Sequence, residues 1–246
     1  MSNNIINFKN KVFLVTGANG HTGKNLCNKL VKLNATVIKT DLSSNKSNNL
    51  FFKADLTKKE DRVILIKKIK QKFKKLDVLV NNAAFIPESK MKVKKSKIYN
   101  KDFINLNLES MINLTELAMP LIKKSNEGII VNISSIYGFL AHDYNLYKNT
   151  QMDPSLSYGL SKAGVIQFTK LIASKLGPKI RVNSISPGGI KRKQNKKFIE
   201  RYKNKTFLKR MCTEDDISNA VIFLSSYMSR YITGQNIIVD GGYSIS

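Results

Sequence analysis

The sequence is poor in the side chains that usually bind metals. It has two histidines and two cysteines in 246 residues. Cys27 and Cys212 are far apart and do not have the spacing of a metal or redox motif, and His21 and His142 are the only histidines. Because a structural zinc site needs about four such ligands close together, we expect no metal.

Long apolar runs are also missing. No stretch of eighteen or more apolar residues occurs, so we expect no membrane-spanning helix and no membrane partner. The N-terminal residues Met-Ser-Asn-Asn-Ile-Ile-Asn contain no basic region followed by an apolar run, so we expect no secretory signal. These two absences predict a cytoplasmic protein.

Acidic residues are scarce. The chain has 17 Asp and Glu against 42 Lys and Arg, which gives a net charge of +25. Such an excess can indicate a nucleic-acid partner. The lysines are spread along the whole chain, however, and no zinc finger, aromatic RNA-binding motif or helix-turn-helix pattern accompanies them. We therefore expect no nucleic-acid partner, and a basic surface that favours anionic substrates.

Segments of strand type and helix type alternate along the chain. Short β-branched or aromatic runs predict strands at 11–16, 35–40, 50–52, 77–84, 128–135, 179–186 and 235–240. Helical spacing predicts helices after Gly23, after a capping box at 57–60, at about 102–124, through Tyr158 to about 176, and at 214–225. This alternation indicates one α/β domain, residues 1–246, with a parallel sheet covered on both faces. The basic, poorly patterned residues at about 190–212 predict a mobile substrate lobe.

A glycine-rich turn joins the first predicted strand to the first predicted helix. It reads Thr16-Gly-Ala-Asn-Gly-His-Thr-Gly23. Glycines let the backbone approach a pyrophosphate closely, and the N-terminus of the following helix meets its negative charge. The strand, turn and helix together predict a dinucleotide site.

Asp41 ends the second predicted strand, eighteen residues after Gly23. A carboxylate at this distance can accept hydrogen bonds from both hydroxyls of the adenosine ribose, and it would repel a 2′-phosphate. Asp41 therefore favours NAD over NADP as the cofactor, although a turn residue at the end of a strand is the alternative interpretation.

Tyr158 and Lys162 are four residues apart and so lie on one face of a helix. A cation about 4 Å from a phenolate, at an effective dielectric constant of about 20, is worth on the order of 4 kcal/mol. We expect this cation to lower the pKa of Tyr158 by roughly two to three units, which would make the phenol a proton donor near neutral pH.

Together these segments resemble the short-chain dehydrogenase/reductase family over residues 11–242. The matching segments, in chain order, are the glycine turn 16–23, Asp55-Leu56, Asn81-Asn82-Ala83-Ala84, Asn107-Leu108, Ser135, Tyr158-x-x-x-Lys162, Pro187-Gly188, Thr233-Gly234 and Val239-Asp240-Gly241-Gly242. The resemblance implies a doubly wound Rossmann fold with a seven-stranded parallel sheet, a nicotinamide cofactor, and a homotetramer or homodimer.

The resemblance also implies roles for single residues. Tyr158 would be the general acid for carbonyl reduction or the base for alcohol oxidation, and Lys162 would lower its pKa and hold the nicotinamide ribose. Ser135, rather than Ser134, would hydrogen-bond the substrate oxygen. Asn107 would hold a water that links Lys162 to solvent. Besides Tyr158 and Lys162, the implied cofactor-binding residues are Gly17, Asn19, Gly20, His21, Thr22, Gly23, Asp41, Asp55, Leu56, Asn82, Ala83, Ala84, Pro187, Gly188 and Ile190.

Three features depart from the family pattern. His21 stands where short members usually have their middle glycine, a spacing more typical of the extended branch, although the length of the chain and the Val239-Asp-Gly-Gly242 ending favour the short branch. Arg192 stands where a threonine often follows the Pro-Gly turn. Ser135 and Tyr158 are twenty-three residues apart, which is more than the family's usual gap.

The extra residues, 141–152, predict a wall of the substrate pocket, because they lie between two catalytic residues. Their polar and aromatic side chains suit a polyol or sugar, namely Tyr144, Tyr147, Lys148, Asn149 and Gln151. This insertion and the Ser-Ile-Ser-Pro-Gly-Gly-Ile stretch resemble a subgroup of the family associated with flagellin and surface-sugar modification, and the basic residues 191–193 would suit an anion. A surface loop or an oligomer contact is the alternative interpretation of the insertion.

We therefore expect an NAD-dependent oxidoreductase that interconverts a secondary alcohol and a ketone on an anionic sugar or nucleotide-sugar derivative. A 3-oxoacyl-(acyl-carrier-protein) reductase is an alternative, which Asp41 disfavours because reductive biosynthesis usually uses NADPH. A non-catalytic protein that senses NAD(P) is an alternative of another class. Such proteins tend to lose the tyrosine or the lysine, and this chain keeps Tyr158 and Lys162.

Overall fold

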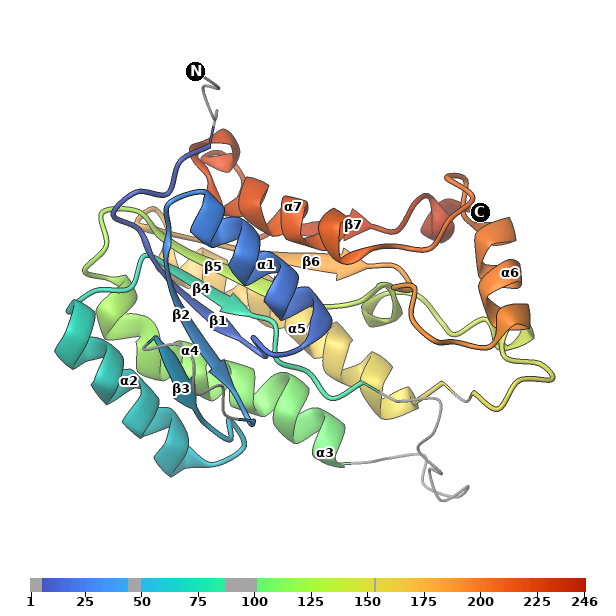
Figure 1. The fold of residues 1–246 in the computed structure, drawn as a ribbon, viewed down its shortest axis with the longest axis horizontal. Helices are drawn as coiled ribbons and strands as arrows, with labels where there is room; N and C mark the ends of the chain where they lie inside the picture. The colour runs from blue at the N-terminus through green and yellow to red at the C-terminus, as the bar shows by residue number, and fades with distance from the viewer. Residues whose placement is uncertain (1–5, 44–49, 87–100, 153) are drawn as a thin grey trace.

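Seven parallel strands form one sheet in the order β3-β2-β1-β4-β5-β6-β7 (Figure 1). The computed structural model describes residues 6–43, 50–86, 101–152 and 154–246. The strands are β1 Val12–Thr16, β2 Thr36–Asp41, β3 Phe51–Lys53, β4 Val78–Asn81, β5 Gly128–Ile133, β6 Ile180–Pro187 and β7 Asn236–Val239. The predicted doubly wound α/β fold is therefore confirmed, and every predicted strand is present.

Helices cover both faces of this sheet (Figure 1). One face carries α1 (His21–Lys32) and α7 (Glu214–Ser225), and the other carries α2 (Lys59–Phe73), α4 (Ser110–Ile122) and α5 (Leu156–Leu176). Alternate side chains of β1 explain this arrangement, because Phe13 and Val15 pack with α1 and α7 while Val12 and Leu14 pack with α2 and α4. Both layers are apolar, as expected for a parallel sheet buried on two sides.

The remaining helices are short, apart from α6 (Lys196–Lys205). They are α3 Lys101–Ile104, the π-helix η1 Asn105–Glu109, and the 3₁₀ turns η2 Ile136–Gly138, η3 Tyr144–Leu146, η4 Tyr227–Ser229 and η5 Tyr243–Ile245. No helix in the described ranges is long and apolar enough to cross a lipid bilayer.

One local prediction was wrong, and the structure refines two others. Thr57 does not cap α2, because its N–H and its hydroxyl both donate to Asp55 Oδ1 and the helix begins at Lys59. The helix predicted at 102–124 is divided into α3, η1 and α4 by the π-turn. The poorly patterned lobe 190–212 contains α6, whose inward face is formed by Phe198 and Tyr202 at i and i+4.

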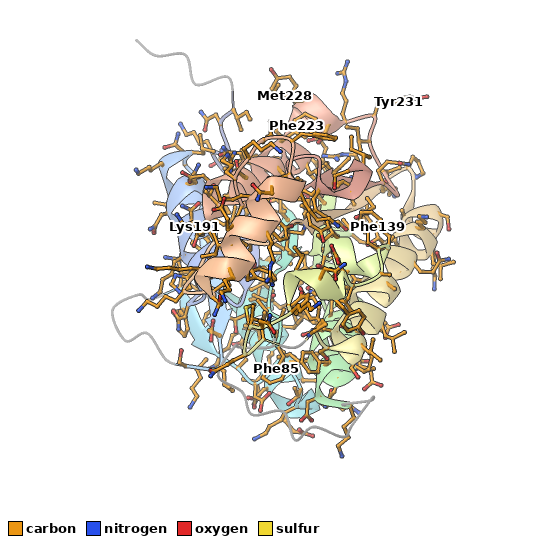
Figure 2. The ribbon with its side chains drawn as sticks, turned by 90° about the vertical axis from the view of Figure 1, so that its right-hand side faces the viewer. Phe85, Phe139, Lys191, Phe223, Met228 and Tyr231 are labelled. Carbon is orange, nitrogen blue, oxygen red and sulfur yellow. The ribbon has the colours of Figure 1, made fainter. Side chains whose placement is uncertain are left out.

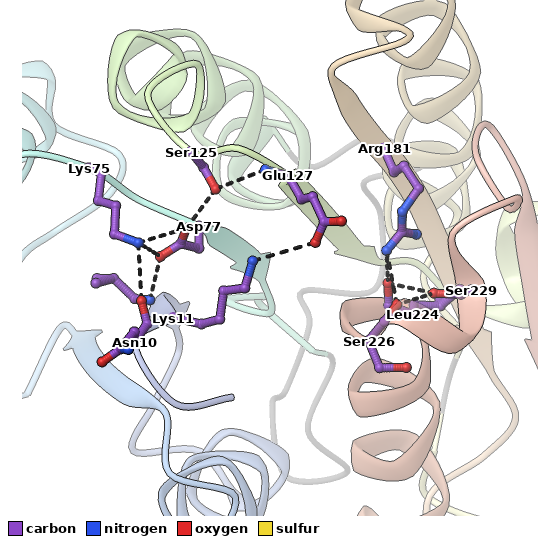
Figure 3. Close-up of polar contacts among 11 residues, drawn as sticks. Asn10, Lys11, Lys75, Asp77, Ser125, Glu127, Arg181, Leu224, Ser226 and Ser229 are labelled. Atoms are coloured by element: carbon purple, nitrogen blue, oxygen red, sulfur yellow. Dashed lines mark hydrogen bonds and ion pairs between the residues drawn. The ribbon is translucent and has the colours of Figure 1, made fainter. Parts of the chain in front are cut away.

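Polar contacts fix the N-terminal ends of the strands, away from the predicted site (Figure 3). Asp77, which is 1% exposed, accepts hydrogen bonds from Val12 N–H at 2.8 Å and Ser125 Oγ at 2.6 Å and pairs with Lys75. Arg181 of β6 donates to the carbonyl oxygens of Leu224, in the last turn of α7, and of Ser226, directly after α7. These contacts set the relative positions of the strands and leave their carboxyl ends for ligands.

Candidate active site

A cavity of about 270 Å³ lies beyond the carboxyl ends of β4, β5 and β6. Nine of the predicted site residues line it: Thr22, Asn82, Ala84, Ser135, Tyr158, Lys162, Pro187, Gly188 and Ile190. Further lining residues come from the insertion 141–152 and from α6. Segments that are far apart in the sequence therefore meet at the carboxyl edge of the sheet, where open α/β folds bind ligands.

The glycine turn packs closely against the segment after β4 and leaves the start of α1 uncapped. Gly17 has φ +64°, and a Cβ there would lie 2.8 Å from Ala83 Cα. Gly20 is the N-cap of α1 and offers no side-chain hydrogen bond, and no acidic residue occurs in the first helical turn. The N–H groups at this end of α1 therefore carry a partial positive charge suited to an anion. Exposed His21 begins the helix, and Thr22 lines the cavity.

Hydrogen bonds hold this turn against the neighbouring strands. Asn82 Nδ2 donates to the carbonyl oxygens of Thr16 and Gly17, at 2.8 and 3.2 Å, and Thr16 Oγ1 accepts from the N–H groups of Asn82 and Ala83. Asp41 Oδ2 accepts from Asn19 N–H at 2.8 Å. The carboxylate thus joins the end of β2 to the glycine turn, and its position beside this turn fits a ribose.

Two predicted adenine contacts differ from each other. Asp55 is partly exposed, and its hydrogen bonds with Thr57 hold the pKa of the carboxyl below its usual range. Leu56 is only 7% exposed and packs in the core between the sheet and α2, while its carbonyl accepts from Arg62 Nη1. Leu56 therefore supports the site from below, and Asp55 is the residue of the pair that faces solvent.

The two serines after β5 have different partners. Ser134 Oγ is buried and donates to the carbonyl oxygen of Lys162 at 2.7 Å. Ser135 Oγ accepts from Tyr137 N–H at 3.2 Å, and it lies near enough to the Tyr158 phenol to lower the pKa of that phenol. Ser134 thus fastens α5 to β5, and Ser135 is the serine that meets the tyrosine.

Tyr158 and Lys162 share one face of α5, as predicted, but the predicted pKa shift of the tyrosine is wrong. Burial raises the pKa of Tyr158, and this effect exceeds the lowering by the neighbouring Ser135 hydroxyl. Lys162 Nζ donates to the carbonyl oxygen of Ile133 at 2.8 Å and lies 5.7 Å from the centre of the Tyr158 ring. Burial lowers the pKa of Lys162 to about 8. The prediction of a lowered pKa for Tyr158 neglected desolvation, which disfavours both the charged phenolate of Tyr158 and the charged ammonium of Lys162.

Asn107 lies in the π-turn η1 and is 2% exposed. Its amide accepts from Phe85 N–H at 2.7 Å and donates to Phe85 O at 3.0 Å and to Ser161 Oγ at 3.3 Å. Asn107 therefore joins the segment after β4 to α5, and its partner in α5 is Ser161, the residue before Lys162. Its predicted role in holding a water stays a prediction.

The insertion 141–152 borders the cavity, as predicted, and it does so with three residues. His142, Tyr147 and Met152 line the cavity, whereas the Tyr144 side chain is 60% exposed and Lys148, Asn149 and Gln151 are exposed. Five side chains of the insertion were predicted from the sequence to contact a sugar substrate. Tyr147 is the one of these five that lines the cavity.

Helix α6 holds the insertion in place (Figure 2, which looks onto this end of the molecule). Arg201 Nη1 donates to the carbonyl oxygens of Asn145, Leu146 and Lys148, and Lys205 pairs with Asp143. Apolar contacts add to this clamp, because the Tyr147 and Phe198 rings lie 5.2 Å apart. The insertion and α6 therefore pack together, and both contribute residues to the lining of the cavity.

Arg192 lines the cavity and is partly neutralised. Its Nη1 lies 2.6 Å from Glu214 Oε1 at the start of α7. Lys191 and Lys193 are exposed on either side of it, and Lys191 is labelled in Figure 2. Of the basic residues 191–193 that we expected to meet an anion, Arg192 is the one at the cavity.

Sequence reasoning missed several residues that line the cavity, namely Tyr137, Phe198, Tyr202 and Met211. Tyr137 follows Ser135 by two residues, and this proximity was a usable signal. Phe198 and Tyr202 have helical spacing within a lysine-rich segment, so the pattern was visible only as a single pair. Among the residues described, no group of three or more His, Cys, Asp or Glu side chains could hold a metal ion.

Known proteins resemble the chain over nearly its whole length. A family model described as enoyl-(acyl carrier protein) reductase matches residues 23–244. The post-translational flagellin modification protein A of Campylobacter coli is 31% identical, over 96% of this chain and 99% of its own. A 3-oxoacyl-(acyl-carrier-protein) reductase of Thermotoga maritima is 33% identical, over 96% of this chain and 98% of its own.

A solved structure has the same fold. It is a short-chain dehydrogenase from Leptospira borgpetersenii with bound NAD⁺. It is 32% identical to this chain, with a TM-score of 0.83, and the match covers 97% of this chain and 94% of that one.

Proposed function

Because the chain belongs to the short-chain dehydrogenase/reductase family of NAD(P)-binding oxidoreductases, we propose that it interconverts a secondary alcohol and a ketone with NAD as its cofactor. The meeting of Ser135, Tyr158 and Lys162 around one cavity is the observation that carries this proposal. The substrate that we favour is a sugar or nucleotide-sugar derivative.

Tyr158 would transfer the proton. In reduction its phenol donates a proton to the substrate oxygen, and in oxidation the phenolate removes it. Ser135, which lines the same cavity as Tyr158, would donate to the same substrate oxygen and stabilise its developing charge. The bound nicotinamide supplies or accepts the hydride.

Lys162 would hold the nicotinamide ribose and stabilise the phenolate. Its ammonium group donates to Ile133 O and lies close to the Tyr158 ring. The burial that raises the pKa of Tyr158 in the ligand-free protein makes the phenol a poor acid. Hydrogen bonds from ribose and substrate would therefore have to lower that pKa before the proton moves.

The cofactor would lie across the glycine turn. The uncapped start of α1 suits the pyrophosphate, and Asp41 beside Asn19 suits the ribose hydroxyls. The carboxylate of Asp41 supports NAD, since a 2′-phosphate would be repelled. Clear preference for NADPH in calorimetric titrations with NADH and NADPH would overturn this assignment.

Three observations support a sugar substrate. The insertion brings Tyr147 and His142 to the cavity, aromatic side chains that can pack on a sugar ring and hydrogen-bond its hydroxyls. Arg192 lines the same cavity, where its guanidinium group, paired with Glu214, suits an anionic group. A relative of similar length is a flagellin modification protein. The relative from Thermotoga maritima favours the alternative, a 3-oxoacyl-(acyl-carrier-protein) reductase.

The test is a substrate panel run with a tyrosine variant. NADH formation is followed with polyols, sugar phosphates and nucleotide sugars, and NADH consumption with acetoacetyl thioesters. On whichever substrate reacts, Tyr158→Phe should lower kcat by about 10² to 10⁴-fold while NADH still binds. Tyr144→Phe, a change of the same kind at an exposed position, should leave kcat unchanged.

Unchanged turnover by Tyr158→Phe would show that another group transfers the proton and would sink the mechanism. Turnover of acetoacetyl thioesters alone would replace the sugar by the acyl-carrier substrate. The homotetramer and the mobility of residues 190–212 stay predictions, which sedimentation and hydrogen exchange can measure.

A further inference from the structure

Tyr137 and Tyr147 place their hydroxyl groups against each other at one wall of the cavity. The two Oη atoms are 2.8 Å apart. Tyr137 belongs to η2, directly after Ser135, and Tyr147 belongs to the insertion. Both line the cavity together with Ser135 and Tyr158. The pair is therefore part of the space in which a substrate would react.

Packing fixes the positions of both rings. Tyr137 packs on the ring of His142, with 4.2 Å between the ring centres, and Tyr147 packs on Phe198. Arg201 of α6 donates to the backbone carbonyl oxygens on both sides of Tyr147, those of Leu146 and Lys148. The hydroxyl pair is therefore preorganised, and binding a ligand there needs little reordering.

The pair has hydrogen-bonding capacity left for a ligand. A phenol has one donor hydrogen and two acceptor lone pairs, so the bond between two phenols uses one hydrogen out of two. Burial raises the pKa of Tyr137, and it raises the pKa of Tyr147 to about 12, so both phenols keep their protons at neutral pH. Tyr158 lines the same cavity as the pair and also contributes to the raised pKa of both phenols.

We propose that the Tyr137–Tyr147 hydroxyl pair is a specificity-determining site that binds a substrate hydroxyl on the carbon next to the one that reacts. The preferred substrates are then vicinal diols and the corresponding α-hydroxyketones, and simple alcohols react poorly. This inference rests on the proposed function, because it takes Tyr158 as the group that transfers the proton. A substrate without the second hydroxyl would leave the one phenol hydrogen that the Tyr137–Tyr147 bond does not use without an acceptor, which a site built for hydrogen bonding strongly rejects.

The experiment compares two small alcohols that differ by one hydroxyl. Oxidation of 1,2-cyclohexanediol, in its cis and trans forms, and of cyclohexanol is measured with NAD or NADP. Wild-type kcat/KM should be at least about tenfold higher for the better diol isomer than for cyclohexanol. Tyr147→Phe and Tyr137→Phe should each lower the ratio of kcat/KM for the diol to kcat/KM for cyclohexanol by about tenfold. The loss should come from a lower kcat/KM for the diol, while kcat/KM for cyclohexanol changes by no more than about twofold.

Tyr144→Phe is the matched control, because Tyr144 lies in the same insertion and its side chain is exposed away from the cavity lining. It should keep the wild-type ratio. Melting temperature and NADH affinity, measured for all variants, report on folding and on the cofactor site.

Equal wild-type kcat/KM for diol and cyclohexanol would overturn the inference and leave the proposed function intact. The inference also fails if the two variants lower kcat/KM equally for the diol and for cyclohexanol. The phenol pair would then only shape the pocket and would not bind the second hydroxyl. Oxidation of neither alcohol by the wild type would also count against the inference. The proposed function is decided separately, by Tyr158→Phe on the substrate panel.

Discussion

The ammonium group of Lys162 is buried and donates a hydrogen bond to the carbonyl oxygen of Ile133. Burial lowers its pKa to about 8, from an ordinary value of 10.5. The folded protein therefore binds fewer protons than the unfolded chain between about pH 8 and pH 10.5. The contribution of this group to stability consequently rises as the pH increases through that window.

Lys162→Met should remove this pH dependence. From pH 7.5 to pH 9.5 the free energy of unfolding of the wild type should rise by about 2 kcal/mol relative to the variant, because the wild-type ammonium loses its proton in the folded state. Urea unfolding of both proteins, without cofactor, at the two pH values measures the difference. A difference that stays constant with pH would mean that Lys162 is better solvated than its burial indicates.

The residue types of the site could be predicted from the sequence, and their pKa shifts could not. Tyr158 and Lys162 at i and i+4 give the shared helix face directly. Desolvation depends on what packs around them, and part of that packing comes from Phe103, whose ring centre lies 6.2 Å from that of Tyr158. Phe103 precedes Tyr158 by fifty-five positions, and no local pattern connects the two residues.

At the scale of elements, the insertion 141–152 depends on α6. Arg201 supplies hydrogen bonds to three carbonyl oxygens of the insertion, and Lys205 pairs with Asp143 near its start. Partly buried contacts of this kind are worth more than exposed ion pairs, because less of the interaction is lost to solvent. The position of Tyr147 at the cavity therefore depends on the end of a helix about fifty residues later in the chain.

Arg201→Met should loosen the insertion without disturbing the sheet. We expect faster amide hydrogen exchange in residues 141–152 and a KM for the substrate raised several-fold, with NADH affinity unchanged. Lys203→Met is the control, since Lys203 pairs with Glu200 of its own helix at 3.9 Å. Equal exchange rates in the two variants would show that apolar packing on Phe198 is enough to hold the insertion.

The elements of the fold were predictable where strand-type and helix-type patterns alternate, and less so where side chains override them. The strands and α7 follow from the predicted apolar and helical patterns, and the structure adds that Thr213 caps α7 with a capping box. Thr57 matched a capping box equally well, but Asp55 takes its hydroxyl and N–H. The π-turn at Asn107 has no sequence signature, because the extra residue is accommodated by tertiary contacts of its amide with Phe85 and Ser161.

For the whole molecule, charge is the dominant feature. Forty-two basic residues against 17 acidic ones give a net charge of +25, and like charges repel one another more strongly in the compact state. The eight ion pairs among the described residues engage only a small part of the basic side chains. Mutual repulsion of the remainder therefore opposes folding at low ionic strength.

Salt should stabilise the protein. At about 0.5 M NaCl the Debye length is less than half its value at 0.1 M, and repulsion between the basic side chains is screened accordingly. The melting temperature should therefore be several degrees higher at about 0.5 M NaCl than at about 0.02 M NaCl. Scanning calorimetry measures the shift. Choline chloride at the same ionic strength should give a similar rise, because screening does not depend on the cation. A melting temperature that falls with salt would indicate that attractive ion pairs outweigh the repulsion.

The clamp between the insertion and α6 has a consequence for evolution and for protein engineering. Transplanting residues 141–152 alone into a relative would leave the carbonyl oxygens that Arg201 binds, and the carboxylate of Asp143, without their partners. The two segments have to be exchanged together, as one cassette. Under the proposed function, such an exchange would alter substrate choice and leave the glycine turn and Asp41, which belong to β1, α1 and β2, as they are.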